Sequence, residues 1–535
     1  MARLGDIEMQ LKTLGVIALY AVLLLAFCLL AAHPYVRPAV IYDEGFALTN
    51  ALRILNGEAP FADFWTVYPP GTSGTLAVFF ALLDESIEIS RLVHVMWAGI
   101  LVTATHYLTF SVTTKLIAVP TAVLVGAWTC LGFTPSYSML PAIALSVSSL
   151  AVLLRGCQNG KQSQAVLGGT VAGLVLFFRH DLSAYLFVSA VAGYFYLHMQ
   201  RHNPDATRYR MLVGHYVVFQ GGTALLGLIV ILMLSGTETF FDQAISFAGS
   251  VQRDQRFLPF PSLLAVWDTS TDLALWSLAW TGPITIFFVA LSLGIWGQSL
   301  PVTNRLLATT TGTLSLLLLF QAFGRLDLIH VTPSLICLTV TVCAMSPIWF
   351  DRTRATARRC VTLMAIAFVT WSATELSKHL HTGTVVSCLS SGGCLRTSAD
   401  QNAAVDFINT NFSSAEPIFV GNGRHDRIFI NDALLYFRLN RPVPTKWSEM
   451  HPGEVTTAKV QSQIMEELEN SPVEVVVLVD IPSGFEDNSS AISSGIYILD
   501  TYLFSNFSTI WRQGRYTVLV RNNRIGRPSV TQIPR

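Results

Sequence analysis

Two adjacent carboxylates, Asp43 and Glu44, are the side chains in this sequence best placed to do chemistry. They stand in the stretch Tyr42-Asp43-Glu44-Gly45, between one long apolar segment and a second that opens at Tyr68-Pro69-Pro70-Gly71. A carboxylate can act as a general base that takes the proton of an attacking hydroxyl group. The alternative is that the pair only stabilises the start of a helix, where the macrodipole favours negative charge.

Basic residues interrupt the apolar pattern at three other places. These places are Arg179-His180-Asp181, the run Arg253-Asp254-Gln255-Arg256, and the group Arg325, Asp327 and His330. Because arginine binds phosphate oxygens bidentately, Arg325 and Arg179 are candidates for holding a phosphate group. Carboxylates and cations around one cavity would suit the transfer of a group away from a phosphate.

Local structural roles are the alternative for each of these groups. Arg179 and Asp181 could form an ion pair at a helix end, and Arg325 and Asp327 could pair only to orient a turn. The run 253–256 could be the solvated face of a loop. The sequence alone leaves both kinds of role open.

The composition is that of a membrane protein. Hydrophobic residues make up 52% of the chain and charged residues 13%, and the mean hydropathy is +0.49. A bilayer core of roughly 30 Å is crossed by about twenty apolar helical residues, so each long uncharged stretch can span it, and we expect about eleven or twelve crossings. These stretches are 15–33, 116–154 (long enough to span twice), 211–237, 273–304, 306–324 and 328–350.

The distribution of cations predicts the orientation of the segments. Clusters at 201–210 and 352–359 mark cytoplasmic loops. Loops 34–70 and 236–272, and the chain after about residue 376, are then exterior, and the apolar segment 15–33 is an uncleaved anchor. One conflict remains, because this orientation requires an odd number of crossings between residues 70 and 200, where six segments are apolar. The run 71–83 or half of 116–154 is then too short to span.

Residues 377–535 have a mixed composition and read as a small α/β domain. Short apolar strands are predicted at Pro417 to Val420, Val473 to Val479 and Tyr516 to Val520. Between the first two strands, Val455 to Leu468 has the spacing of an amphipathic helix. Strands alternating with helices favour an α/β arrangement.

Two cysteines, Cys388 and Cys394, flank a Ser/Gly loop at the start of this domain. On the exterior side of a membrane they could form a disulfide, and the alternative is two free thiols.

The first exterior loop resembles that of the GT-C membrane glycosyltransferases. It is closest to the bacterial branch related to protein mannosyltransferases and to the lipid A aminoarabinose transferase. The matching motifs are Tyr42-Asp43-Glu44-Gly45, Ala51 to Gly57, Pro60 to Phe64 and Tyr68-Pro69-Pro70-Gly71. The stretch Gly324 to His330, with Pro333, is similar to the late exterior loop of the family.

The resemblance implies a polytopic α-helical membrane protein of the GT-C type. Its catalytic bundle would occupy residues 1–376, and an exterior or periplasmic α/β domain would occupy residues 377–535. The implied enzyme is a hexosyl- or pentosyltransferase of the cell (inner or plasma) membrane that contributes to glycan biosynthesis in the cell envelope. It would transfer a sugar from a polyprenyl-phosphate donor to a hydroxyl group of a glycan, lipid or protein acceptor, by an inverting mechanism.

The resemblance makes Asp43 the catalytic base, and Glu44 would be second to it, positioning the acceptor or a metal. Arg325, His330 and Arg179 would hold the donor phosphate. The supporting residues would be Asp327, Asp181, His180, Tyr68 and Arg53. Tyr68 and Trp65 could stack on a sugar or isoprene unit, or only anchor the membrane interface.

No cofactor is certain from the sequence. Mg²⁺ or Mn²⁺ held by Asp43 and Glu44 remains open, because adjacent carboxylates offer oxygen ligands to such ions. Membrane lipids are expected partners, and nucleic acid is not.

Two other function classes fit parts of the pattern. Charged residues within a membrane bundle are also typical of a substrate pathway, so a transporter or flippase of lipid-linked glycans is the alternative. It is less favoured because no inverted repeat is visible and the polar residues gather toward the exterior side. A scaffold that binds through its α/β domain would leave Asp43 without a role.

Overall fold

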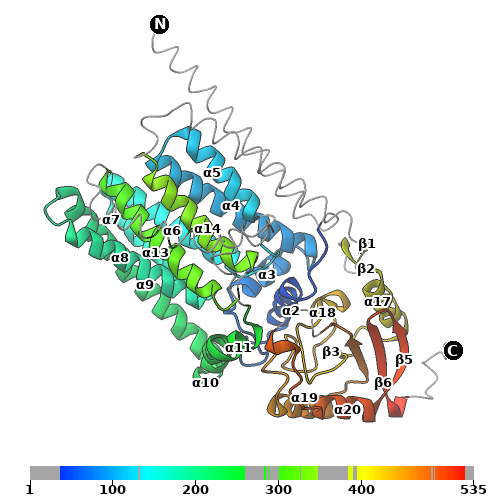
Figure 1. The fold of residues 1–535 in the computed structure, drawn as a ribbon. Coiled ribbons are helices and arrows are strands. Elements are labelled where there is room, and N and C mark those ends of the chain that lie inside the picture. Colours follow the sequence, from blue (N-terminus) through cyan, green and yellow to red (C-terminus); the bar gives the residue numbers. More distant parts are fainter. Residues whose placement is uncertain are drawn as a thin grey trace, which may run out of the picture.

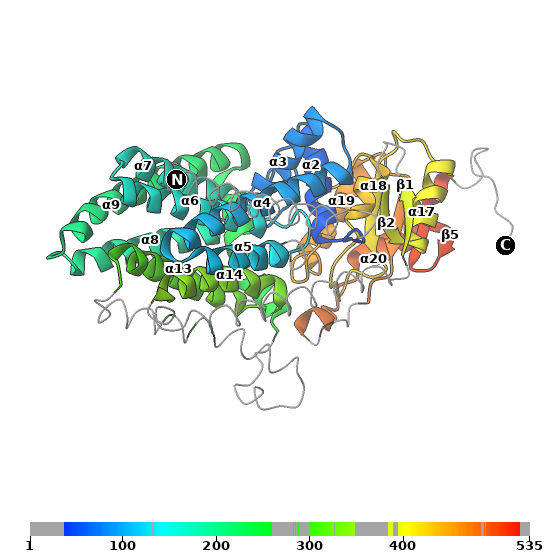
Figure 2. The same ribbon diagram turned by 90° about the horizontal axis from the view of Figure 1, so that it is seen from above.

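The structure is a computed structural model with two parts, a helical bundle and a C-terminal α/β domain, which lie beside each other (Figures 1 and 2). It describes residues 37–129, 133–258, 300–325, 327–347, 384–388, 394–482, 486 and 488–524, together with 282, 284 and 287. The predicted anchor at 15–33 lies outside these residues, and so do most of 259–299 and 348–383.

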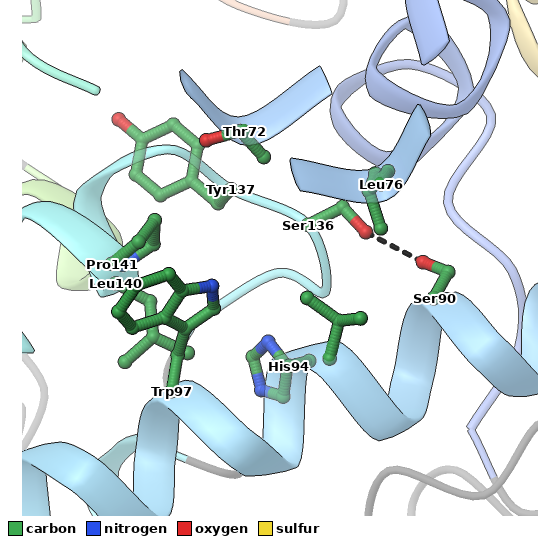
Figure 3. Close-up of a pocket in the computed structure, with 10 residues that line it drawn as sticks. Thr72, Leu76, Ser90, His94, Trp97, Ser136, Tyr137, Leu140 and Pro141 are labelled. Atoms are coloured by element: carbon green, nitrogen blue, oxygen red, sulfur yellow. Dashed lines mark hydrogen bonds between the residues drawn. The ribbon is translucent and has the colours of Figure 1, made fainter. Parts of the chain in front are cut away.

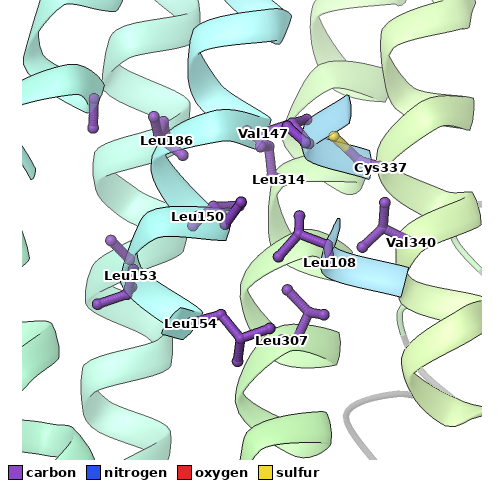
Figure 4. Packing of buried hydrophobic residues seen from close by; sticks show 14 of the residues in the cluster. Leu108, Val147, Leu150, Leu153, Leu154, Leu186, Leu307, Leu314, Cys337 and Val340 are labelled. Atoms are coloured by element: carbon purple, nitrogen blue, oxygen red, sulfur yellow. The ribbon is translucent and has the colours of Figure 1, made fainter. Parts of the chain in front are cut away.

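Apolar helices of very different length form the bundle. They are α3 (Gly71–Leu82), α4 (Ile87–Val112), α5 (Lys115–Ala127), α6 (Met139–Asn159), α7 (Gln162–Leu174), α8 (His180–Met199), α9 (Pro204–Ser235), α13 (Val302–Ala322) and α14 (Leu328–Met345). Leucine and valine side chains of α4, α6, α13 and α14 meet in one buried cluster that includes Leu108, Leu150, Leu307 and Val340 (Figure 4). Tight packing of these branched side chains fixes the relative positions of the helices.

Four described helices, α4, α6, α8 and α9, are long and apolar enough to cross a membrane. The surface of α9 is apolar as well, since Met233 is 82% exposed and Val218 is 69% exposed. A helix that is hydrophobic all round belongs in a core or a bilayer. The prediction of a polytopic α-helical membrane protein is therefore confirmed, while the total number of crossings depends on segments outside the described residues.

The six apolar segments between residues 70 and 200 form the six helices α3 to α8, and the stretch 116–154 divides into α5 and α6. Helix α3 has 12 residues, and α5 and α7 have 13 each. All three are shorter than the roughly twenty residues that cross a bilayer. The odd number of crossings that the predicted orientation requires between residues 70 and 200 therefore concerns these short helices. The run 71–83, expected to be too short to span, forms the 12-residue α3.

A four-stranded sheet forms the centre of the C-terminal domain, in the order β3-β4-β6-β5. Its strands are β3 (Ile418–Asn422), β4 (Val475–Val479), β5 (Phe507–Gln513) and β6 (Tyr516–Arg521). Strands β3 and β4 are parallel and the other pairs are antiparallel. The sequence predicts three of the four strands and misses β5, of whose seven residues one is buried and three are exposed.

Helices cover both faces of this sheet. The cluster on one face includes side chains of α17 (Ala399–Asn411) and α18 (Leu434–Leu439), and the cluster on the other includes α19 (Ala458–Asn470) and α20 (Ile498–Asn506). The predicted amphipathic helix is α19, which buries Val460, Ile464 and Leu468. At the start of the domain, β1 (Thr384–Cys388) pairs with β2 (Cys394–Ser398). Cys394 is disulfide-bonded, and Cys388 stands opposite it in the ladder.

Helix α2 (Asp43–Leu55) joins the two parts through a close approach at Gly45. A Cβ atom on Gly45 would lie 2.8 Å from Leu434 Cα and 3.0 Å from the carbonyl carbon of Ala433. The amide of Leu434 donates to the carbonyl of Ile41 (3.0 Å), and Thr49 Oγ1 donates to the carbonyl of Ala433 (2.9 Å). The glycine of the Asp-Glu-Gly motif therefore lets α2 pack directly on α18, which holds Asp43 at the junction of bundle and domain.

Candidate active site

Asp43 lies in the first turn of α2, half-buried, and no hydrogen bond or ion pair is formed by its carboxylate with the described residues. It does not cap the helix, since the capping position is Tyr42 and no side chain bonds there. Burial raises the pKa of the Asp43 carboxyl above its ordinary value; nearby Arg256 and His330 act in the opposite direction, and Asp327 and Glu449 add to the increase. The free carboxylate thus lies among ionisable groups from three separate parts of the chain.

Glu44 is fully buried and engaged by Arg91 of α4. Arg91 Nε donates to Glu44 Oε1 (2.6 Å) and Arg91 Nη2 donates to Oε2 (2.8 Å). The backbone amide of Val40 also donates to Oε2 (3.0 Å). These bonds tie α2 to α4 and turn the carboxylate away from a shared role with Asp43.

A metal site at Asp43 and Glu44, which the sequence leaves open, does not fit this arrangement, because Arg91 already binds both oxygens of Glu44. No group of three or more His, Cys, Asp or Glu side chains within the described residues could hold a metal ion. We therefore place no metal ligand at this pair.

The loop before α14 forms a compact ion-pair network around Asp327, the capping residue of that helix. Asp327 Oδ1 accepts from the amide of His330 (3.0 Å) and lies 2.6 Å from His330 Nδ1, while Oδ2 accepts from Arg325 Nε (2.9 Å). Burial opposes ionisation, but His330 and Arg325 hold the pKa of Asp327 down to about 2. The other two guanidinium nitrogens of Arg325 both donate to Glu486 of the C-terminal domain.

Each guanidinium nitrogen of Arg325 consequently donates to a carboxylate, and the Arg325–Asp327 pair that orients the turn is present. His330 keeps its Nε2 without a partner among the described residues, and its ring acts electrostatically on the nearby Asp43.

Arg179 precedes α8 and forms the local ion pair that the sequence allowed. Its Nε and Nη2 donate to Asp181 at 2.9 and 2.6 Å, and its guanidinium lies over the ring of Tyr68, 5.0 Å from the centroid. Its third nitrogen, Nη1, is buried without a hydrogen-bond partner among the described residues. Arg179 therefore retains one donor for a ligand. His180 Nδ1 is likewise buried and unpartnered, but no described contact links it to Asp43.

Gly71 explains why the Tyr-Pro-Pro-Gly motif lies beside Arg179. A Cβ atom on Gly71 would come within 2.7 Å of the carbonyl carbon of Phe177 and 2.9 Å of the Phe178 ring. The start of α3 therefore contacts the chain just before Arg179. Tyr68, three residues before Gly71, consequently lies against the Arg179 guanidinium.

Aromatic rings connect the cations to the carboxylate. The Tyr68 ring stacks on Phe46 (6.0 Å) and meets Tyr137 edge-on (6.3 Å), and Tyr137 meets His330 (6.4 Å). Arg179, Tyr68, Tyr137 and His330 therefore form one continuous wall. The other predicted aromatic, Trp65, lies elsewhere, against Trp447 and His451.

Arg53 has a structural position. Its guanidinium donates to Glu58 Oε2 (2.7 Å), to the carbonyl of Thr445 (3.0 Å) and to the carbonyl of Asp63 (3.2 Å). It thereby ties the segment between α2 and α3 to the C-terminal domain rather than facing Asp43.

Arg256, at the end of α11 (Gln252–Arg256), is a cation near Asp43 that the sequence interpretation left out of the site. Its guanidinium lies over the Phe429 ring at 5.0 Å, its Nε is buried without a hydrogen-bond partner, and it forms no ion pair with the described residues. The arginine-rich run 253–256 was the available signal, although nothing in it distinguished Arg256 from the exposed Arg253.

Glu449 and His451 were also missed, because they come from a loop of the C-terminal domain that carries no recognisable motif. Both are buried, and Glu449 Oε1 lies 2.7 Å from His451 Nε2. Burial raises the pKa of Glu449 to about 8 and lowers that of His451 well below its ordinary value, so the pair is neutral. The hydroxyl of Tyr42, which precedes Asp43, lies 2.9 Å from Nε2 of His451.

A small cavity lies on the bundle side of Tyr137, lined also by Ser90, His94 and Ser136 (Figure 3). Its volume is about 10 Å³, which suits roughly one water molecule. The two serine hydroxyls are 2.7 Å apart, and His94 Nε2 has no partner among the described residues. The cavity is too small for a sugar.

Comparison with protein-family models gives no match, and neither does comparison with curated proteins. Solved structures do match. ArnT from Cupriavidus metallidurans bound to undecaprenyl phosphate has a TM-score of 0.56 at 12% identity, with 94% of this chain and 98% of that chain covered. The apo state of the same protein has a TM-score of 0.58 at 12% identity, with 95% and 98% covered.

An oligosaccharyltransferase from Archaeoglobus fulgidus, in complex with Zn and sulfate, matches with a TM-score of 0.51 at 11% identity, covering 94% of this chain and 73% of that one. At such identities the likeness concerns the fold. The fold predicted from the motifs between Tyr42 and Gly71 is thereby confirmed: the chain has the GT-C fold, a polytopic membrane bundle followed by a smaller C-terminal domain.

Proposed function

We propose that this protein is an integral-membrane glycosyltransferase. It transfers a sugar from a polyprenyl-phosphate donor to an acceptor hydroxyl group on the exterior face of the membrane, with inversion at the anomeric carbon. The observation that carries the proposal is Asp43, a carboxylate without a described partner beside Arg256 and His330. Such an arrangement unites a base with cations where bundle and C-terminal domain meet.

In this reaction Asp43 takes the proton from the acceptor hydroxyl as the hydroxyl oxygen bonds to the anomeric carbon. The bond between that carbon and the phosphate oxygen breaks, and the electron pair leaves with the polyprenyl phosphate. A single carboxylate suffices, and no covalent intermediate on the enzyme is needed. The raised pKa of Asp43 makes it a stronger base than an exposed aspartate.

The donor phosphate is held by Arg256, Arg179 and His330. Arg256 and Arg179 each keep a guanidinium nitrogen without a hydrogen bond among the described residues, and His330 keeps its Nε2. Charge-assisted bonds from these groups would strengthen as charge builds on the leaving phosphate. Arg325 has a different role in this account, because it is saturated by Asp327 and Glu486 and fastens the late loop to the C-terminal domain.

Undecaprenyl phosphate bound to ArnT supports a polyprenyl donor for this chain, given the shared fold. The donor sugar and the acceptor are left to experiment. The apolar, largely exposed surface of α9 is compatible with a lipid chain approaching from the bilayer.

The test is an assay of purified protein in nanodiscs with a panel of polyprenyl-phosphate sugars, in which free polyprenyl phosphate and glycosylated product are quantified. The proposal expects release of polyprenyl phosphate with at least one donor. Translocation of a lipid-linked sugar across proteoliposomes without its cleavage would instead identify a flippase.

A further inference from the structure

The bundle has a second end, remote from the proposed active site, at which the turn between α8 and α9 lies farthest from the C-terminal domain (Figures 1 and 2). Helix α13 starts at this end, because Arg325, just beyond its other end, binds Glu486 of the C-terminal domain. With 21 residues at about 1.5 Å each, α13 is roughly 30 Å long, about the thickness of a bilayer core. The start of α13 and the proposed active site therefore lie at opposite faces of the membrane.

Arg305, in the first turn of α13, is a cation that the proposed mechanism does not use. It is 5% exposed, and its guanidinium forms no hydrogen bond or ion pair with the described residues. Arg91 and Arg179, which are similarly buried, each pair with a carboxylate. Buried charges are ordinarily paired in this way, because taking them out of water is costly. The unpaired Arg305 therefore indicates a counter-charge that comes from a ligand.

The guanidinium of Arg305 can be reached from outside. Of its three nitrogens only Nε is fully enclosed without a partner, so the two Nη groups reach the protein surface. Pro301 is exposed and Thr303 is half-buried, so the first turn of α13 is open as well. The stem of Arg305 thus lies within the bundle while its charged end faces the membrane boundary, as long cationic side chains commonly do.

Tyr196 of α8 is the neighbour of Arg305 across the helix pair. Its hydroxyl is buried without a hydrogen-bond partner among the described residues, and the charge of Arg305 acts on it. Gly193, one turn earlier, sets this approach, because a Cβ atom there would lie 2.6 Å from Thr310 Cγ2 and 3.1 Å from Leu306 Cδ1. On this side Arg305 therefore faces a neutral hydroxyl and not a carboxylate.

The start of α13 adds backbone donors at the same place. Its capping residue is Pro301, and no side chain caps the helix. The first amides of a helix lack intrahelical partners and favour an anion, and side chains on a helix lean toward its N-terminus, which brings the Arg305 guanidinium toward these amides. Asn304 fixes the position of this turn, since its Nδ2 donates to the carbonyls of Val112 (3.0 Å) and Ala344 (2.9 Å).

Apolar side chains lie next to this cationic site. Phe195 and Met199 of α8, on either side of Tyr196 in the sequence, are each 60% exposed. The turn that follows α8 carries the exposed Arg201 and Arg208. Exposed apolar side chains beside cations at a membrane boundary suit an anion that is attached to acyl chains, which a free phosphate ion is not.

We propose that Arg305 and the start of α13 bind the phosphate group of a membrane phospholipid, in the leaflet opposite the proposed active site. The Nη groups of Arg305 donate charge-assisted hydrogen bonds to the phosphate oxygens, and the first amides of α13 donate to the same group. The acyl chains lie against Phe195 and Met199. The bound lipid supplies the counter-charge of Arg305 and thereby stabilises the packing of α13 against α8.

The experiment measures lipid binding to the whole chain, purified in detergent and stripped of lipid, by native mass spectrometry. The probes are dioleoyl-phosphatidylglycerol, dioleoylglycerol, which lacks the phosphate, and inorganic phosphate alone. We expect saturable binding of phosphatidylglycerol and much weaker binding of dioleoylglycerol. Arg305→Gln should lower the affinity for phosphatidylglycerol by roughly tenfold or more. Arg201→Gln, which removes an exposed arginine at the same end of the bundle, should leave that affinity unchanged.

Melting temperatures distinguish a ligand site from a purely structural arginine. Without lipid, Arg305→Gln should melt at or above wild type, because it removes a buried charge that has no counter-charge. With phosphatidylglycerol, wild type should gain stability that the variant lacks. Equal lipid affinity of the two proteins, or a variant that melts below wild type without lipid, would overturn the proposal. Inorganic phosphate that stabilises wild type as much as the lipid does would overturn the lipid as its source. No sugar donor takes part, so each result is independent of the transferase proposal.

Discussion

Glu44 of α2 and Arg91 of α4 form a buried ion pair with two hydrogen bonds. Asp43, next to Glu44 in the same turn of α2, keeps its carboxylate free among the described residues. Two adjacent acids of the same motif therefore have different tasks. Glu44 fastens α2 to α4, and this contact holds Asp43 at the junction of bundle and C-terminal domain.

Replacing Glu44 by Gln should destabilise the protein. Breaking a buried ion pair by removing one partner costs about 3–5 kcal/mol, and Glu44→Gln removes the carboxylate that Arg91 binds with two nitrogens. The apparent melting temperature in nanodiscs should fall well below that of wild type, while Asp43→Asn, one residue away, should melt close to wild type. A Glu44→Gln protein that melts normally but transfers no sugar would give Glu44 a part in the chemistry after all.

Replacing Gly45 by Ala should loosen the contact between α2 and α18. The added methyl group meets the backbone of Leu434 and Ala433, which cannot rotate away as a side chain would. Overpacking of this kind costs about 1–3 kcal/mol. Limited proteolysis should then cleave between bundle and C-terminal domain faster than in wild type. Gly74→Ala is the matched control, since nothing lies within 4 Å of its added Cβ; equal proteolysis of both variants would argue against the close approach.

Glu449 should make the stability of the protein decrease as the pH rises. The pKa of this carboxyl is about 8 in the folded protein, against an ordinary value of 4.5. Between these values the folded protein holds a proton that the unfolded chain has released, so the free energy of unfolding falls across this window and levels off above it. Melting curves from about pH 5 to about pH 9 should show a gain of Glu449→Gln over wild type that grows with pH. A difference in melting temperature between Glu449→Gln and wild type that does not change with pH would mean that Glu449 is ionised in the folded protein. Glu469→Gln, at an exposed position, is the control.

Arg256→Gln should weaken the binding of polyprenyl phosphate. Loss of a charge-assisted hydrogen bond costs about 1.5–3 kcal/mol, or roughly 10- to 100-fold in affinity. Arg253→Gln removes an exposed arginine of the same run and should leave the affinity unchanged. The affinities are measured by calorimetric titration. If both substitutions lowered the affinity equally, Arg256 would act only through its positive charge and not through a hydrogen bond to the phosphate.

The sequence predicted those features that depend on local pattern. Long apolar runs indicated the bundle, the spacing of Val460, Ile464 and Leu468 indicated α19, and the loop around Asp43 indicated the GT-C fold. Apolar spacing of this kind shows which residues of a helix or strand are buried, so it can be read from the sequence alone.

The composition of the site could not be predicted in the same way. Arg256 comes from α11 and Glu449 from the C-terminal domain, so both are brought near Asp43 only by the tertiary fold, and no spacing along the chain records that proximity. The partner of Glu44 and the second partner of Arg325 were equally hidden, because Arg91 lies inside an apolar helix and Glu486 in the distant domain. Long-range pairing decides which charged groups are free, and those free groups define the site.

Single-turnover transfer by the Asp43→Asn variant tests the central claim most directly. The variant and wild type would be compared in nanodiscs with the donor that wild type cleaves, and donor affinity would be measured in parallel. The account predicts a fall in the transfer rate of about 100-fold or more, as for the loss of a general base, with donor affinity and melting temperature close to those of wild type. Transfer at the wild-type rate would contradict it and would remove Asp43 from the mechanism.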